Sequence, residues 1–156
     1  MTDHRPTTIT AQPGEPFVDI ERDFDATPAQ VFRAYTDPEL LPQWLGPRDL
    51  KMELLEFDPR SGGGYRYVHR GRDVEAYFHG VFHTVSQGTL IIQTFEFEGA
   101  PDQVCLESVH FTEHDGLTRM HSHSVFPSVE ARDMAMASGM SRGIIDSYER
   151  LDELTF

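Results

Sequence analysis

Three histidines near a predicted hairpin turn are the side chains best suited to metal chemistry. His121 and His123 lie two positions apart on a predicted strand, so they point to the same face. The Asp115-Gly116 pair is a strong two-residue turn signal, and such a turn places His110 opposite His121. Three imidazoles with a water are a common zinc set. Polar residues of a one-sided sheet belong by default to its outer face. The solvated interpretation is therefore favoured, and no metal is expected.

The opposite face of the same hairpin carries a carboxyl group among apolar side chains. The same turn places Phe111 opposite Met120, and the face with this apolar pair is assigned to the interior. That face contains Glu107, Val109, Phe111, Met120, Ser122 and Ser124. A buried carboxyl group with a raised pKa can act as a general acid or base. Arg22 is in phase with apolar residues of the first strand, and a structural ion pair between Arg22 and Glu107 is the favoured interpretation.

Phenol and imidazole groups alternate along another predicted strand. Tyr65, Tyr67 and His69 share one face. If this face is the inner one, as we favour, these residues are the few polar groups that orient an apolar guest. If it is the outer one, they form ordinary aromatic cross-strand pairs. On the next strand the inner face stays undecided between two pairs, Tyr77 with His79 and Phe78 with Phe82.

One long C-terminal helix is predicted over residues 128–154, with glycines inside it. Its apolar residues recur every three or four positions: Met136, Met140, Ile144, Tyr148 and Leu151. Gly139 and Gly143 lie within this pattern, although each costs roughly 1 kcal/mol relative to alanine. Small residues beside flexible methionines leave room for a guest molecule, or they allow two backbones to pack closely. The pattern supports both interpretations. Trp44 is expected on the wall of the resulting cavity.

The elements that must position these residues show no alternation of strands and helices. A first strand is predicted over 17–25, and Thr27-Pro28 then opens a helix. Asp37-Pro38 opens a second, short helix by the same arrangement. Further strands are expected near 49–58, 64–70, 74–85, 89–98, 104–113 and 117–126. Strands joined by short turns predict an antiparallel sheet in an α+β fold.

Length and charge limit the function classes. The 156 residues fit one domain, predicted over 17–156 after a disordered leader over 1–16. Lys and Arg number 13 against 26 Asp and Glu, a net charge of −13 that disfavours binding to nucleic acid or anionic membranes. No apolar run is long enough to span a membrane, and the leader lacks an apolar signal core. A cytoplasmic protein is expected.

Four motifs occur in an order that resembles a known superfamily. They are FDATPAQVFRAYTDPELLPQWLGP, FDPRSGGGYRY, GLTRMHSHSVF and GMSRGIIDSYERLDEL. Together they resemble the START-like helix-grip (SRPBCC) superfamily, and more narrowly the bacterial homologues of the C-terminal domain of the heat-shock-protein-90 ATPase activator. The resemblance covers roughly residues 17–156. It implies a β-α-α-β6-α fold, in which a curved antiparallel sheet wraps around a long C-terminal helix and encloses a hydrophobic cavity.

The resemblance transfers fold better than function, because members include ligand binders, cyclases, aromatases and co-chaperones. The leading hypothesis is binding of a small, mostly hydrophobic molecule that is lipid-, polyketide- or aromatic-like. The expected cavity residues are Trp44, Tyr65, Tyr67, His69, Glu107, Val109, Phe111, Met120, Ser122, Met136, Met140 and Ile144. No catalytic residue is assigned and no cofactor is expected.

Two other function classes and two partner expectations complete the hypotheses. One alternative is a cyclase-, aromatase- or hydrolase-type enzyme in the same cavity, with Glu107, His69 or Tyr65 as its acid or base. The other is a co-chaperone-like ATPase activator, weakened because only a short leader precedes the fold. A homodimer is compatible with the sequence, and a chaperone partner is not favoured.

Overall fold

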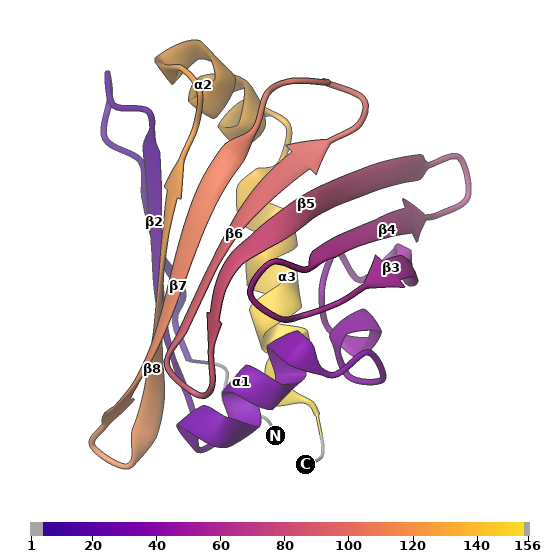
Figure 1. Ribbon diagram of the computed structural model, residues 1–156. Helices are drawn as coiled ribbons and strands as arrows, with labels where there is room; N and C mark the ends of the chain where they lie inside the picture. Colours follow the sequence, from indigo (N-terminus) through magenta and orange to yellow (C-terminus); the bar gives the residue numbers. More distant parts are fainter. Residues whose placement is uncertain (1–4, 155–156) are drawn as a thin grey trace.

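The computed structural model describes residues 5–154, which form one curved antiparallel sheet with helices on its concave side (Figure 1). The strands are β1 (Thr8–Thr10), β2 (Phe17–Phe24), β3 (Lys51–Phe57), β4 (Gly64–Arg70), β5 (Glu75–Ser86), β6 (Leu90–Phe97), β7 (Cys105–His114) and β8 (Leu117–Val125). Their order across the sheet is β1-β2-β8-β7-β6-β5-β4-β3. The predicted α+β fold and antiparallel pairing are confirmed, and the predicted strands differ from the observed ones only at their ends.

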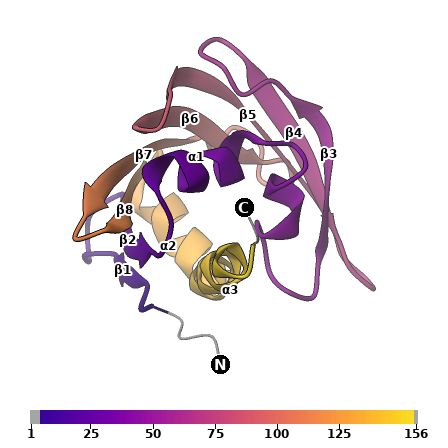
Figure 2. The same cartoon turned by 90° about the horizontal axis from the view of Figure 1, so that it is seen from below.

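Helices fill the hollow of the curved sheet. They are α1 (Pro28–Thr36), the 3-10 helix η1 (Leu41–Gln43), α2 (Val129–Ala137) and α3 (Met140–Asp152). Seen from below, the sheet curves around α1 and α3 (Figure 2). The Thr27 side chain accepts a hydrogen bond from the Gln30 amide, and the Gln30 side chain accepts one from the Thr27 amide, which is the capping box expected at this start. The second predicted helix is only η1, because the chain then turns at Trp44 to bury its indole.

The predicted C-terminal helix is two helices, α2 and α3, rather than one. Gly139 separates them with a φ of +92°, in the left-handed region that glycine adopts most readily. The prediction of one helix over 128–154 is therefore wrong, and Gly139 makes a bend. Gly143 lies within α3, where an added Cβ would meet Pro47 at 3.7 Å, an ordinary contact distance.

Alanine at these two glycines should have opposite effects on stability. Gly139→Ala would force a side chain into the left-handed region, and we expect a loss of about 1–2 kcal/mol in the free energy of unfolding. Gly143→Ala fits without displacing Pro47, and we expect a gain of up to about 1 kcal/mol. Urea denaturation of both variants measures these values. Similar losses at the two positions would contradict the bend.

Strand β1 lies in the segment predicted to be a disordered leader. Ile9 is paired with Ile20 of β2, and its side chain packs against the core. The alternation of Thr8, Ile9 and Thr10 suits an edge strand, because β-branched residues pack well on a pleated surface. The expectation for 1–16 is corrected at these residues. Residues 1–4 of that segment lie outside the described residues.

The hairpin of β7 and β8 has the predicted register. Asp115 and Gly116 form its two-residue turn with φ values of 50° and 78°, as a type I′ turn requires. Phe111 is paired with Met120 and His110 with His121. The predicted interior residues Val109, Phe111, Met120, Ser122 and Ser124 are each at most 8% exposed. The assignment of the two faces is therefore confirmed at these positions.

Helix α3 is fixed to the sheet and to the loop after η1. Tyr148 packs edge-on against Phe24 of β2, with ring centroids 5.7 Å apart, and stacks on Trp44 at 6.2 Å. The Ser147 hydroxyl accepts a hydrogen bond of 2.8 Å from the Gly46 amide. These contacts hold α3 across the concave side of the sheet.

Candidate functional site

Glu107 lies on the inner face of the sheet, between neutral hydrogen-bond donors. Its cross-strand neighbours are Gln93 on β6 and Ser124 on β8. The Gln93 side chain donates to one carboxyl oxygen at 3.1 Å, and the Ser124 hydroxyl donates to the other at 3.4 Å. Burial raises the pKa of Glu107 above its ordinary value of 4.5, although both hydrogen bonds act to lower it. Within the described residues no cation pairs with this carboxyl group.

Arg22 points to the interior but does not pair with Glu107, so the predicted ion pair is wrong. Its guanidinium binds the Asp152 carboxylate at 2.5 Å and lies over the Phe24 ring at 4.8 Å. The reason is position along the strand. Glu107 is level with Val18 across β8, and Arg22 is four residues further along β2, about 13 Å away at the usual rise. Periodicity identified the face of Arg22 but not its partner.

Two tyrosines of β4 face the interior, as we favoured. Tyr65 and Tyr67 are each 6% exposed, and their rings stack with centroids 6.0 Å apart. The Tyr65 hydroxyl donates to the Thr94 carbonyl oxygen at 2.6 Å, and its ring covers Gly80, where an added Cβ would collide with it. The Tyr67 hydroxyl has no hydrogen-bond partner among residues 5–154. Burial, and then the Glu107 charge, raises the pKa of both phenols.

Two further tyrosines come from the helices. Burial raises the pKa of Tyr148 on α3 to about 12, and that of Tyr35 on α1 well above its usual range, with Glu107 contributing to both. The Tyr35 hydroxyl is buried beside that of Tyr148 without hydrogen-bond geometry. Burial and Glu107 also raise the pKa of the Cys105 thiol, which is therefore unreactive. The Glu107 charge therefore raises the pKa of four phenols, which are carried by β4, α1 and α3.

Several side chains on the inner face near Glu107 are only half-buried. Glu107 and Gln93 lie deep in the fold, yet they are half-buried because neighbouring side chains do not close over them. The half-buried apolar residues packed around the core include Phe78, Phe95, Met136, Met140 and Ile144. In contrast, Val18 of β2 and Met120 of β8 are completely buried. The inner residues of β2 and β8 named here are therefore completely buried, whereas β5 and β6 carry both buried residues, Phe82 and Ile91, and half-buried ones, Phe78 and Phe95.

His69 closes one end of the tyrosine row. Burial lowers its pKa to about 4, with a smaller contribution from Arg150, so the imidazole is neutral. Its ring lies against Gly46, where an added Cβ would come within 2.2 Å of it. The left-handed Gly46, with a φ of +109°, allows both the turn and this contact. Arg150 of α3 donates to the Gly46 carbonyl oxygen at 3.0 Å, which ties the same loop to the helix.

Trp44 is a structural residue of the core. It is 1% exposed, and its indole N–H donates to the Ala34 carbonyl oxygen at 2.8 Å. It contacts the phenol cluster through Tyr35, whose ring centroid is 4.8 Å away. Phe111 likewise packs on Tyr35, at 5.0 Å. Trp44 and Phe111, both predicted to line the cavity, therefore pack against the ring of Tyr35.

The predicted histidine face lies outside, where Asp19 of β2 joins it. His121 and His123 lie 3.1 Å and 2.8 Å from the Asp19 carboxylate. Within residues 5–154, no group of three or more His, Cys, Asp or Glu side chains is arranged to hold a metal ion.

The register of β4 and β5 shows which residues of β5 face the interior. Tyr67 is paired with Phe78, so Phe78 points inward and the neighbouring Tyr77 points outward.

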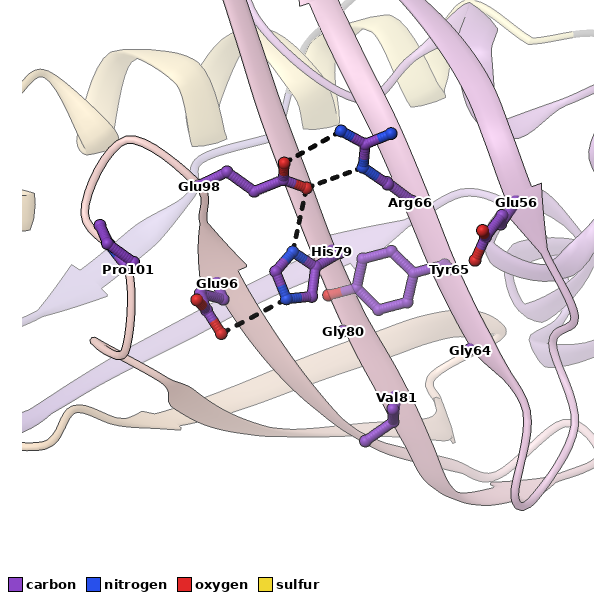
Figure 3. Close-up of a pocket in the computed structure, with 10 residues that line it drawn as sticks. All are labelled: Glu56, Gly64, Tyr65, Arg66, His79, Gly80, Val81, Glu96, Glu98 and Pro101. Atoms are coloured by element: carbon purple, nitrogen blue, oxygen red, sulfur yellow. Dashed lines mark hydrogen bonds and ion pairs between the residues drawn. The ribbon is translucent and has the colours of Figure 1, made fainter.

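A hollow on the outer face is lined by charged side chains (Figure 3). It has a volume of about 520 Å³. Arg66 donates two hydrogen bonds to Glu98, and His79 lies between Glu98 and Glu96, at 3.0 Å and 3.4 Å. A second hollow, of about 510 Å³, lies around Lys51 and Met52 at the edge strand β3. Tyr65 lines the first hollow, and Glu107 lines neither of the two.

Comparison with known proteins assigns the family. The model of the family described as Activator of Hsp90 ATPase homolog 1-like protein matches residues 25–155. The chain belongs to this family. The match covers every element from α1 onward, and the helix-grip fold implied by the motifs is confirmed. A comparison with curated proteins gave no match.

Solved structures share the fold of this family member over nearly its whole length. A protein from Rhodobacter sphaeroides is 28% identical, with 94% of this chain and 95% of the other covered and a TM-score of 0.83. Protein Ms6760 from Mycobacterium smegmatis is 24% identical, with 97% and 98% covered and a TM-score of 0.87. A protein from Arthrobacter aurescens is 24% identical, with 93% and 88% covered and a TM-score of 0.85. None of the helices described in this family member has the length and apolar character needed to cross a membrane.

Sequence reasoning missed three residues of the site in this family member. Gln93 alternates with Ile91 and Phe95 along β6, so the sequence predicts that its side chain points inward. Its pairing with Glu107 could not be predicted, because the connection over 98–104 is irregular. Tyr35 and Tyr148 fit the apolar periodicity of their helices. This periodicity predicts that they are buried but does not indicate which groups surround their hydroxyls. Only the docking of α1 and α3 brings them to Glu107.

Proposed function

We propose that this protein binds a small, mostly apolar molecule between β5–β6 and α3, with the polar end of the molecule at Glu107. One observation carries the proposal: a carboxyl group without a cation partner lies among phenols and half-buried apolar side chains on the concave face. Ligand sites are typically concave and mostly apolar, with a few convergent polar groups. An apolar body with a single polar group fits this surface.

Hydrogen-bond capacity supports the proposed orientation. The Tyr67 side chain is 6% exposed, and its hydroxyl makes no hydrogen bond within residues 5–154, so it can bond to a polar atom of a guest. Glu107 keeps lone pairs beyond those used by Gln93 and Ser124. A polar atom of a guest placed between Tyr67 and Glu107 would satisfy both. Phe78 and Phe95, stacked with centroids 5.3 Å apart, would contact its apolar body.

Filling the proposed space should abolish binding of an apolar probe. Met140 begins α3, is half-buried and packs against the core, so tryptophan there would occupy volume that a guest needs. We expect Met140→Trp to weaken binding of the uncharged dye Nile red by about tenfold or more. Fluorescence titration measures the affinity, and circular dichroism checks the fold.

The matched control is Met134→Trp. Met134 on α2 is 73% exposed, so the same substitution adds a tryptophan outside the proposed space. We expect its Nile red affinity to equal that of the unmodified protein. Equal loss in both variants, or no saturable binding to the unmodified protein, would contradict the proposed function.

Acid–base catalysis in the same space is the second candidate function. The observation that favours it is the raised pKa of the enclosed Glu107 beside the Tyr67 phenol. A carboxyl group whose pKa is raised by burial is better suited to proton transfer than an exposed one. Glu107→Gln would then retain binding of the substrate and lose its conversion.

A further inference from the structure

The Glu107 carboxyl group lacks a compensating charge. A carboxylate has about four lone-pair sites, and Gln93 and Ser124 use one on each oxygen. Both donors are neutral. The interior guanidinium of Arg22 is displaced along β2 and is already paired with Asp152. Buried charges are normally paired, so a cation brought by the guest would complete this site.

The surroundings of Glu107 suit an organic cation. Tyr67 stacks on Phe78 with centroids 5.2 Å apart and lies 5.1 Å from the His69 ring. Aromatic rings attract ammonium groups, most strongly where water is excluded. His69 adds no competing positive charge, because its pKa is lowered to about 4. The other titratable groups that face Glu107 are phenols and the Cys105 thiol, all with raised pKa and therefore neutral.

The charge of the whole protein acts in the same direction. The net charge is −13, which attracts cations and repels anions as they approach. Arg150 points away from the space to donate to the Gly46 and Pro47 carbonyl oxygens. A carboxylate-bearing guest, such as a fatty acid, would meet Glu107 without any unpaired cation nearby. An ammonium-bearing guest would meet a partner of opposite charge.

We propose that the guest carries a protonated amine on an apolar or aromatic body, with the ammonium group bound by the Glu107 carboxylate and the tyrosine side chains around it. This inference rests on the proposed binding function and specifies the chemical class of its ligand. A neutral hydroxyl-bearing guest is the competing chemistry, because a protonated Glu107 could donate a hydrogen bond to it.

The test compares 4-phenylbutylamine with 4-phenylbutanol, which share a body and differ in charge. Isothermal titration calorimetry should show the amine binding about tenfold or more tightly, as a charge-assisted contact predicts. Affinity for the amine should rise from acid to neutral pH as Glu107 ionises, because the proton and the ammonium group compete for one carboxylate. Affinity for the alcohol should not rise over this range.

Two variants separate this inference from the proposed function. Glu107→Gln should remove the advantage of the amine and keep binding of the alcohol and of Nile red. Glu56→Gln removes one exposed carboxylate on the outer hollow and should leave the preference unchanged. Equal or tighter binding of the alcohol, or an amine preference that survives Glu107→Gln, overturns the amine inference while Nile red binding still supports the proposed function. Failure of all three probes to bind overturns both.

Discussion

Asp152→Ala should lower the free energy of unfolding by about 3–5 kcal/mol, the usual cost of breaking a buried ion pair by removing one partner. The Arg22 side chain is completely buried and the Asp152 side chain is 14% exposed, with 2.5 Å between their charged atoms. Without this carboxylate, the guanidinium would keep the Asp23 carbonyl oxygen and the Phe24 ring, neither of which neutralises its charge. Urea denaturation at neutral pH measures the loss.

Two controls define the meaning of that loss. Glu53→Ala removes a carboxylate from an exposed ion pair with Arg70, and such pairs contribute about 0–1 kcal/mol. Replacing Arg22 by methionine and Asp152 by leucine together should cost much less than Asp152→Ala, because no buried charge remains. A loss no larger than that of Glu53→Ala would show that Arg22 does not depend on Asp152.

Glu107→Gln should stabilise the protein, and the gain should appear only as the pH rises. The folded pKa of Glu107 lies above the ordinary 4.5, so below about 4.5 the carboxyl group is protonated in both folded and unfolded states. As the pH rises, the unfolded chain ionises first, and the natural protein loses stability until its folded carboxyl group also ionises. Glutamine does not ionise, and we expect a gain of roughly 1–3 kcal/mol at neutral pH.

Thermal denaturation of both proteins across a pH series measures this difference. The two proteins should have the same melting temperature at acid pH. As the pH rises, the melting temperature of Glu107→Gln should exceed that of the natural protein by an increasing amount, which then becomes constant. Glu56→Gln, on an exposed residue, should show no such gap. If Glu107→Gln were less stable at every pH, the buried carboxylate would be a net stabilising group, and its charge could not be uncompensated in the fold.

The inner position of Glu107 was predictable from a short-range signal. Asp115-Gly116 is a turn in which both residues adopt positive φ, so it sets the register of the hairpin and the face of each residue. The pairing of Phe111 with Met120 then assigned that face to the core. Local turn chemistry and period-two alternation are therefore sufficient for the sheet and one wall of the site.

Side-chain contacts that depend on tertiary packing could not be predicted from the sequence. Alternation placed Arg22 on the inner face, but its contact with Asp152 depends on how the end of α3 approaches β2. Tyr35 meets Glu107 only through the docking of α1. The break at Gly139 was missed for another reason, since the apolar period continues through it and a glycine in a helical pattern does not reveal its φ.

The location of a bound apolar molecule is most directly measured through the methyl groups of the methionines. In protein labelled with 13C at these methyls, saturation with Nile red should shift the resonances of Met136 and Met140, which are half-buried and pack against the core. Met134, which is 73% exposed on α2, should not shift. Shifts limited to Met134 or to Met52 beside the second hollow, at β3, or no shifts at saturation, would contradict a binding site between the sheet and α3.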